Sequence, residues 1–253
     1  MCGTCGCGED DGPRYTHLTE HAHHHEHPRT VVLEQRVLGR NDDLAAQNRR
    51  ELAARGIVAI NLMSSPGSGK TTLLERTIAD LAPQWPIGVL EGDQETLLDA
   101  TRIRAAGAPV VQINTGAGCH LDAEMLRGGL AALEPAPGSL LFIENVGNLV
   151  CPALFDLGET GRVVVMSVTE GDDKPIKYPH MFRTADLVLI NKVDLLPYVD
   201  FDQERCAGQV RALNPAAAVL PLSATRGEGL GAWYAWLQAR APHRRPVQFD
   251  SRG

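Results

Sequence analysis

The stretch Ser64-Ser65-Pro66-Gly67-Ser68-Gly69-Lys70-Thr71-Thr72 decides the fold of this chain. It joins an apolar run, residues 57–63, to a helical pattern at residues 71–81. It matches G-x-x-x-x-G-K-[ST], the phosphate-binding loop between a strand and a helix, except that Ser64 replaces the first glycine. In such a loop, backbone amides surround phosphate oxygens at the N-terminus of the helix. An ordinary Gly/Ser turn before a helix is the alternative, but the Lys-Thr-Thr sequence and the apolar helix behind it favour the phosphate-binding loop.

The residues of this loop are the expected nucleotide ligands: Gly67, Ser68, Gly69, Lys70, Thr71 and Thr72. Lys70 is expected to contact the β- and γ-phosphates, and Thr71 to place its hydroxyl on Mg²⁺. Both residues are therefore catalytic candidates for phosphoryl transfer.

Apolar runs alternate with helical patterns along most of the chain. The expected strands are residues 57–63, 87–91, 110–114, 140–144, 163–168, 187–191 and 217–221. They are short, rich in Val, Ile and Leu, and not alternating, which is typical of parallel strands covered on both faces. The expected helices are residues 71–81, 97–106, 122–133, 203–213 and 230–240, after an earlier helix that Asn41 or Asp42 caps and that runs to about Arg55. The alternation, with the phosphate-binding loop after its first strand, predicts an α/β fold with a doubly wound, mainly parallel sheet of the P-loop type.

The base is indicated by Asn191-Lys192-Val193-Asp194, which ends the run 187–191. An aspartate in this pattern accepts hydrogen bonds from guanine, whereas adenine has no donor at N1 and would leave the carboxylate unpaired. We expect Asn191 to contact the base, the Lys192 stem to cover the ring, and the loop at Ser223 and Ala224 to present a backbone amide to the guanine O6. A solvated turn is the alternative for the tetrapeptide alone. Behind a phosphate-binding loop it predicts GTP and GDP as ligands.

Two further segments are candidates for sensing the γ-phosphate. Glu144-Asn145-Val146-Gly147 ends the run 140–144, and we expect Glu144 near Mg²⁺ and Gly147 at the γ-phosphate. Asp93 follows the run 87–91 and has two interpretations: it orients the attacking water, or it caps the helix at Thr96. No glutamine or arginine finger is evident, so we expect slow hydrolysis by the isolated protein.

Residues 1–30 carry a separate set of metal-binding side chains. Cys2, Cys5 and Cys7 place three thiols on a glycine-rich backbone, which suits square-planar Ni²⁺ or tetrahedral Zn²⁺. An incidental cysteine-rich tag is the alternative. Six of the nine histidines lie at positions 17, 21, 23, 24, 25 and 27. Their tract is interrupted, which favours loose metal storage over a purification tag.

The core of the chain holds another set of soft ligands. Cys119 and His120 lie on a glycine-rich loop after the run 110–114, and Cys151 follows Gly147 by only a few residues. Singly, each thiol reads as a buried core residue. Together they place two thiols and an imidazole beside the nucleotide-sensing loops, which predicts a metal site under the control of GTP.

Composition limits the class of protein. Of 253 residues, 43% are hydrophobic and 22% charged, as in soluble globular proteins, and the net charge of −7 argues against a nucleic-acid partner. No apolar run approaches the ~20 residues of a membrane span. No signal-peptide pattern opens the chain. Six cysteines are too few and too uneven for a disulfide scaffold, so we expect a cytoplasmic location. The expected domains are a disordered metal-binding arm at 1–30, a GTPase domain at 31–241 and a flexible tail at 242–253.

These motifs resemble the hydrogenase nickel-incorporation GTPases, the HypB family. The resemblance covers nearly the whole chain and rests on residues 2–7, 64–72, 114–122, 142–152 and 167–175. It implies a SIMIBI-type GTPase that forms a GTP-dependent homodimer, with a Ni²⁺ or Zn²⁺ site at the interface built by Cys119 and His120 of both subunits and with Cys151 nearby. It also implies two partners, a HypA-type metallochaperone and a hydrogenase large-subunit precursor, and nickel delivery for [NiFe]-hydrogenase maturation. Ser64 in place of glycine is usual for this family.

Other interpretations fit parts of the sequence. The urease nickel GTPase is similar in its nucleotide motifs, but its metal loop reads Cys-Pro-His, whereas Cys119 and His120 are adjacent. A cobalamin-associated chaperone GTPase is a further rival. A nickel-storage protein with a vestigial GTPase is opposed by the intact phosphate and base motifs. A signalling GTPase leaves three clusters of metal ligands unexplained.

Overall fold

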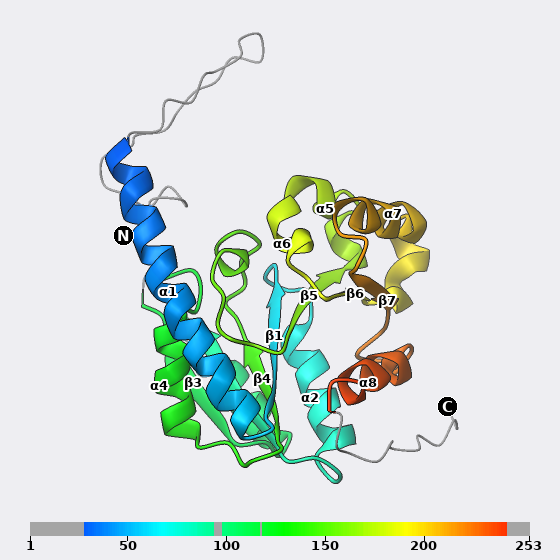
Figure 1. The fold of residues 1–253 in the computed structure, drawn as a ribbon. Coiled ribbons are helices and arrows are strands. Elements are labelled where there is room, and N and C mark those ends of the chain that lie inside the picture. Colours follow the sequence, from blue (N-terminus) through cyan, green and yellow to red (C-terminus); the bar gives the residue numbers. More distant parts are fainter. Residues whose placement is uncertain (1–27, 94–97, 117, 242–253) are drawn as a thin grey trace.

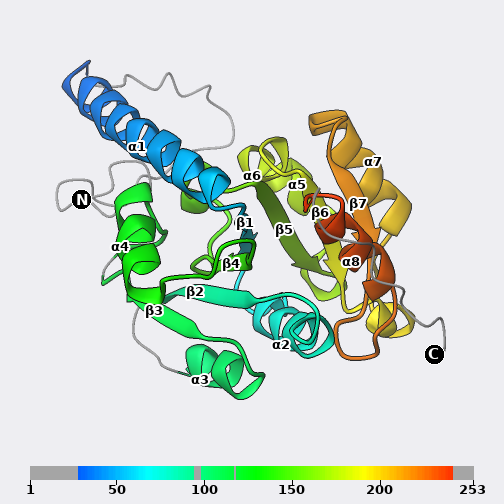
Figure 2. The ribbon, with the colours of Figure 1, turned by 60° about the horizontal axis from the view of Figure 1, so that its bottom comes forward.

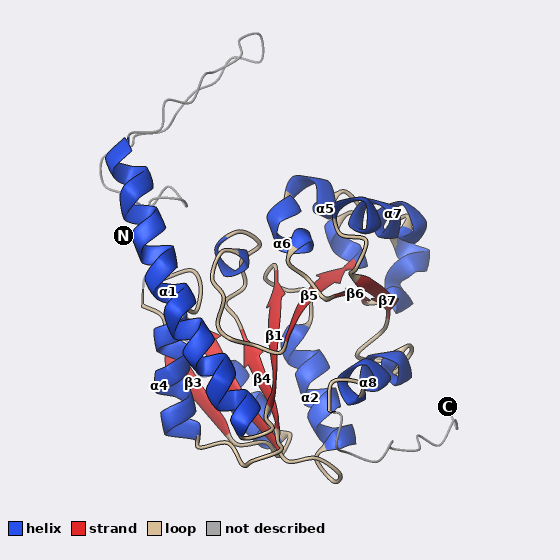
Figure 3. Cartoon of the chain, in the orientation of Figure 1, coloured by secondary structure: helices blue, strands red, loops and turns tan. Residues whose placement is uncertain are grey.

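The computed structural model describes residues 28–93, 98–116 and 118–241, which build one parallel sheet covered by helices (Figure 1 and Figure 3). Its strands are β1 (Val58–Ser64), β2 (Ile87–Asp93), β3 (Val110–Asn114), β4 (Leu140–Glu144), β5 (Gly161–Ser167), β6 (Leu187–Asn191) and β7 (Ala218–Pro221). The seven strands lie in the order β3-β2-β4-β1-β5-β6-β7, and every neighbouring pair is parallel. The predicted doubly wound parallel α/β fold is confirmed.

Helices cover both faces of the sheet because its strands are apolar on both sides. The α-helices are α1 (Pro28–Ala54), α2 (Lys70–Leu81), α3 (Leu98–Ala105), α4 (Ala123–Leu133), α5 (Lys174–Lys177), α6 (Pro179–Arg183), α7 (Gln203–Leu213) and α8 (Leu230–Gln238). Ile60 and Leu62 of β1 pack with α2 and α8 on one face. On the other face Ala59 packs with α1 and α4, and Met63 with α6 and α7. Figure 2 shows α1 and α4 on the opposite side of the sheet from α2 and α3.

The first helix differs from the sequence prediction. Helix α1 already begins at Pro28, so neither Asn41 nor Asp42 is its N-cap. The side chain of Asn41 is buried and acts on other segments: its Oδ1 accepts the amide of Ala123 at 2.9 Å, and its Nδ2 donates to the carbonyl of Asp156 at 2.8 Å. Asn41 thus satisfies the first amide of α4, which has no partner within its own helix.

The remaining element boundaries agree with the prediction to within a few residues. The sequence did not predict the short helices α5 and α6, or the 3₁₀ turns η1 (Cys151–Ala153), η2 (Val168–Glu170) and η3 (Val193–Tyr198). These segments are too short for a helical period to show in the sequence. The division into an arm, a GTPase domain and a tail stays a prediction, because residues 1–27 and 242–253 lie outside the described residues. None of the described helices combines the length and the apolar character of a membrane span.

The strand order determines where a ligand binds. β1 lies between β4 and β5, and the chain leaves it toward β2 on one side before returning to β5 on the other. In open parallel sheets, ligands bind at the carboxyl ends of the strands at such a switch point. The phosphate-binding loop follows β1 at this point.

Candidate functional site

The phosphate-binding loop ends where α2 begins, at Lys70. Gly69 has a φ of 97°, and a Cβ there would lie 2.5 Å from the Nδ2 atom of Asn191, so the position accepts only glycine without movement. Lys70 is half-buried, and its Nζ donates to Ser64 Oγ at 2.7 Å. Burial lowers the pKa of Lys70, against the attraction of Glu144 and other carboxylates. This lysine at a helix N-terminus is placed to receive an anionic phosphate.

The base-reading segment is hydrogen-bonded to the phosphate-binding loop. Asn191 Nδ2 donates to the carbonyl of Ser68 at 2.9 Å, and Lys192 Nζ donates to the carbonyl of Gly67 at 2.7 Å. The residues predicted to bind guanine, at the end of β6, therefore lie next to those predicted to bind phosphate, although the two motifs are more than a hundred residues apart in the sequence.

The predicted base contacts also meet one another. Asn191 Oδ1 accepts the amide of Ala224 at 3.1 Å, and Asp194 Oδ1 accepts the hydroxyl of Ser223 at 2.5 Å. The hydrogen bond from Ser223 orients the carboxylate, which leaves its other oxygen for a ligand.

One buried carboxylate accepts the hydroxyl proposed for Mg²⁺, and a second lies beside it on the neighbouring strand. Thr71 Oγ1 donates to Glu144 Oε1 at 2.8 Å, and Glu91 of β2 lies directly opposite Glu144 in the β2–β4 register. Among the described residues, Glu91 Oε2 and Glu144 Oε2 are buried without a hydrogen-bond partner. Two carboxylates on neighbouring strands, one of them bonded to a threonine hydroxyl, supply the oxygen donors that Mg²⁺ prefers, so these residues fit the cation.

Glu91 was missed at the sequence level. Burial, with the charges of Glu144, Asp93 and Asp99, raises the pKa of Glu91 to about 8, and Lys70 opposes the shift. Burial likewise raises the pKa of Glu144. One signal was present in the sequence, a carboxylate within a run of buried apolar residues, but its partner across the sheet depends on the strand order.

The segment after β4 lies against the phosphate-binding loop. A Cβ on Gly147 would come within 3.1–3.2 Å of Pro66, so this glycine allows close approach of the two backbones. Thr72 Oγ1 accepts from Arg102 Nη2 of α3 at 3.2 Å. Asp93 ends β2, and its carbonyl accepts the amide of Thr115. Residues 94–97 are outside the described ranges, so both interpretations of Asp93 stay predictions.

The three core metal candidates lie together. The ligand atoms of Cys119, His120 and Cys151 are all within 4.8 Å of one another. The two Sγ atoms are 2.8 Å apart, and Cys119 Sγ is 3.8 Å from His120 Nδ1. Two thiols and an imidazole suit nickel, zinc or another metal that accepts soft ligands. The N-terminal candidates Cys2, Cys5 and Cys7 lie outside the described residues.

The imidazole of His120 is held in place from one side. Its ring stacks on Phe155 with a centroid distance of 3.9 Å and an interplanar angle of 23°. Burial lowers the pKa of His120, against the charge of Asp122. A neutral imidazole retains the lone pair that metal coordination needs. Phe155 was not a sequence-level candidate, because nothing in the sequence places it on His120.

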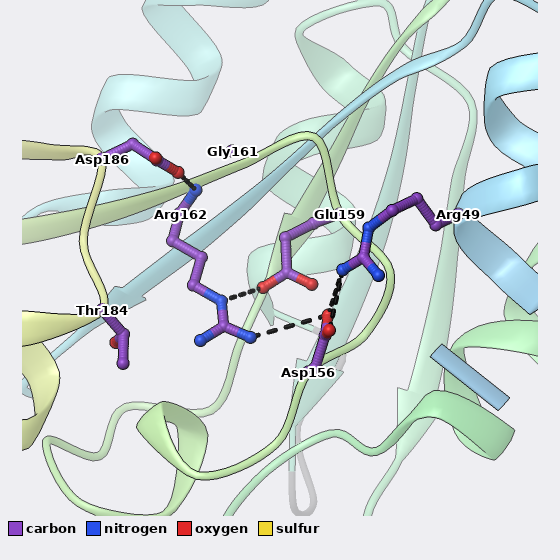
Figure 4. A pocket seen from close by; sticks show the side chains of 7 residues that line it. All are labelled: Arg49, Asp156, Glu159, Gly161, Arg162, Thr184 and Asp186. Carbon is purple, nitrogen blue, oxygen red and sulfur yellow. Dashed lines mark hydrogen bonds and ion pairs between the residues drawn. The ribbon is translucent and has the colours of Figure 1, made fainter. Parts of the chain in front are cut away.

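A pocket of about 340 Å³ lies at the amino ends of β5 and β6, whereas the site described above lies at the carboxyl ends of the strands (Figure 4). Its arginines bind carboxylates of the chain itself: Arg49 contacts Asp156 at 2.7 Å, and Arg162 contacts Glu159 at 2.6 Å. Both arginines of this pocket are therefore already paired, and it does not extend the site described above.

The fold and this site define a P-loop nucleotide-binding protein with a candidate metal site beside its nucleotide loops. A family model described as "CobW/HypB/UreG, nucleotide-binding domain" matches residues 58–221. The hydrogenase maturation factor HypB of Azotobacter vinelandii is 55% identical over 223 residues, which span 88% of this chain and 74% of that protein. The chain belongs to the HypB family of hydrogenase maturation factors.

Solved structures agree with this assignment. The chain is similar to the crystal structure of hydrogenase maturation factor HypB from Archaeoglobus fulgidus, with a TM-score of 0.76, 43% identity and coverage of 81% of this chain and 100% of that one. It is also similar to HypB from Helicobacter pylori in complex with nickel, with a TM-score of 0.75, 38% identity and coverage of 83% and 100%. The predicted family is thereby confirmed.

Proposed function

We propose that this chain is a GTP-hydrolysing nickel metallochaperone that delivers nickel for maturation of [NiFe]-hydrogenase. One observation carries the proposal: Cys119, His120 and Cys151 converge within 4.8 Å, and Cys151 follows the segment at Gly147 that lies against the phosphate-binding loop. Similarity to a HypB in complex with nickel supports nickel as the cargo.

Each residue of the nucleotide site has a role in the proposed hydrolysis. The loop amides and Lys70 bind the phosphates, and Asp194 selects guanine. Thr71, Glu144 and Glu91 would hold Mg²⁺, which when bound neutralises charge on the β- and γ-phosphates. Asp93 is proposed to orient the attacking water. The intrinsic rate is expected to be slow, because no glutamine or arginine finger is evident among the sequence motifs.

We also propose which proteins assemble for nickel transfer. We expect a GTP-dependent homodimer in which Cys119 and His120 of both subunits meet, with Zn²⁺ as a competing metal. The proposed partners, in the cytoplasm, are a HypA-type metallochaperone and a hydrogenase large-subunit precursor. The Cys2, Cys5 and Cys7 cluster is proposed to supply a second metal site.

The test is nickel titration of the full chain with Cys2, Cys5 and Cys7 changed to Ser, in GDP–Mg²⁺ and then in a non-hydrolysable GTP analogue with Mg²⁺. A coupling of about 1–3 kcal/mol would change the nickel affinity about 5–150-fold between the two states. Cys151→Ala should abolish the difference. Cys206→Ala, at a buried thiol of α7 that contacts Met166, is the matched control and should retain it.

Equal nickel affinities in both nucleotide states would contradict the proposed control of the metal site by GTP. Phosphate release from GTP, measured on the same protein, separates the proposal from a nickel-storage protein, which would bind the metal without turnover.

A further inference from the structure

A row of buried amide side chains connects the switch segment after β4 (residues 144–147) with the metal loop before α4 (residues 118–121). Its central member, Asn145, follows Glu144 and is 1% exposed. Its Oδ1 atom accepts two backbone amides, that of Leu121 at 3.1 Å and that of Val146 at 3.0 Å. Leu121 is the residue after His120, and Val146 is the residue before Gly147. A single oxygen atom therefore bridges the backbone of the metal loop and the backbone of the switch.

Asn145 is held in this orientation by a second asparagine. Its Nδ2 donates to Asn61 Oδ1 at 3.3 Å, and Asn61 Nδ2 donates to Glu159 Oε1 at 3.2 Å. Because the Glu159 carboxylate only accepts, Asn61 must turn its Nδ2 toward Glu159 and its Oδ1 toward Asn145. The Oδ1 atom of Asn145 must therefore face the two amides.

The row ends on a rigid anchor. Glu159 Oε1 also accepts from Arg162 Nε at 2.6 Å, and Glu159 Oε2 accepts the amide of Leu157 at 2.8 Å. Figure 4 shows the pairing of Glu159 with Arg162. Asn61 itself lies on the central strand β1 and is 0% exposed. The far end of the row is thus fixed to the sheet, while its near end holds two loops.

We propose that Asn145 is the positioning residue that transmits the nucleotide state to the Cys119–His120 loop. The inference rests on the proposed function, in which a γ-phosphate displaces Gly147. Val146 precedes Gly147 and must follow it. Since its amide shares an acceptor with Leu121, that displacement either moves Leu121 or breaks one of two buried hydrogen bonds, and an unpaired buried amide is unfavourable.

This connection differs from the covalent one through Cys151. The chain from Gly147 leads along the backbone to the Cys151 thiol. The Asn145 bridge acts on the loop that carries Cys119 and His120. Cys151 on one side and Cys119 with His120 on the other would then move together. Because metal–ligand bonds at such a site must be about 2.0–2.3 Å long, this movement would change the metal affinity.

The experiment compares nickel affinities in GDP–Mg²⁺ and in the GTP analogue, on the full chain with Cys2, Cys5 and Cys7 changed to Ser. Asn145→Ala should reduce the ratio of the two dissociation constants from about 5–150-fold to within about twofold of unity. A merely structural role would weaken nickel binding in both states alike and keep the ratio.

The matched control is Asn214→Ala. Asn214 Nδ2 donates to three backbone carbonyls, those of Phe182, Arg183 and Ala185, in a turn remote from both sites. This variant should lower the melting temperature and keep the ratio. A full ratio in Asn145→Ala would overturn the inference while leaving the proposed function standing. A ratio of unity in the protein with native Asn145 would overturn the control by GTP that the proposed function includes, and the inference with it.

A second measurement does not depend on the folding of the variant. In the protein with native Asn145, hydrogen exchange at the amides of Leu121 and Val146 should change together when the analogue replaces GDP. Exchange that changes at Val146 while Leu121 stays constant would overturn the bridge, even where nickel affinity responds to the nucleotide.

Discussion

At the scale of single residues, Asp194 carries the choice of base. Its carboxylate is oriented by the Ser223 hydroxyl at 2.5 Å, so it presents a fixed acceptor to the guanine donors. Asp194→Asn should weaken GTP binding by about 2–5 kcal/mol, because it removes one partner of a charged hydrogen-bonded pair. The variant should favour xanthine nucleotides, to which an amide can donate. Titration with both nucleotides measures this, with the exposed Asp200→Asn as control, and unchanged GTP affinity in Asp194→Asn would contradict the assignment.

Glu91 makes the stability of the chain depend on pH. Its pKa rises from 4.5 to about 8 on folding, with burial as the first cause and the facing Glu144 carboxylate as the second. The folded chain therefore holds a proton that the unfolded chain loses. This contribution to stability is complete below pH 4.5 and disappears as the pH rises to about 8.

Melting temperatures without Mg²⁺ and nucleotide test this dependence. Between pH 5 and pH 8 the native chain should lose stability relative to Glu91→Gln, because glutamine carries no proton to lose. The exposed Glu51→Gln should follow the native chain. A constant difference between native chain and Glu91→Gln across this range would show that Glu91 does not titrate there.

At the scale of elements, α1 is attached to the site by buried amides along one face. Asn48 is 0% exposed, and its Nδ2 donates to the carbonyls of Ala123 at 2.8 Å and Leu157 at 3.1 Å. One side chain thus ties α1 to the start of α4 and to the segment before β5. Helix packing alone would not fix this position, since apolar contacts are not directional.

Asn48→Ala should lower the free energy of unfolding by about 1–3 kcal/mol, because it removes the two buried hydrogen bonds that Asn48 donates to Ala123 and Leu157. Denaturant unfolding measures the change. Gln47→Ala, on the exposed side of the same helix, should change stability by no more than about 0.5 kcal/mol. Equal effects in the two variants would mean that Asn48 contributes only helix propensity.

At the scale of the whole molecule, the nucleotide and metal residues lie on loops at the carboxyl ends of the strands. β1, β4 and β6 end at the phosphate-binding loop, the switch segment and the base-reading loop, and β3 leads into the metal loop. All strands are parallel, so these loops emerge on the same side, and the paired charges of the pocket in Figure 4 lie on the other. Communication between the two ligands therefore needs no movement across the sheet.

Local motifs alone predicted the family, the strand–loop–helix at residues 57–81, the base-reading tetrapeptide and the Cys119–His120 pair. Each of these features depends on residues that are adjacent in the chain. Their residue types and spacing determine the local backbone conformation. The same reasoning placed the start of α1 wrongly, because Asn41 resembles a cap and serves α4 instead.

Only the tertiary structure decided which distant side chains meet. Glu91 faces Glu144 because β2 and β4 are neighbours, Cys151 reaches Cys119 across 32 residues of sequence, and Phe155 stacks on His120. The bridge at Asn145 likewise joins two loops that lie on different elements. Such pairs depend on strand order and on packing, which the whole apolar core selects and which no short stretch of sequence encodes.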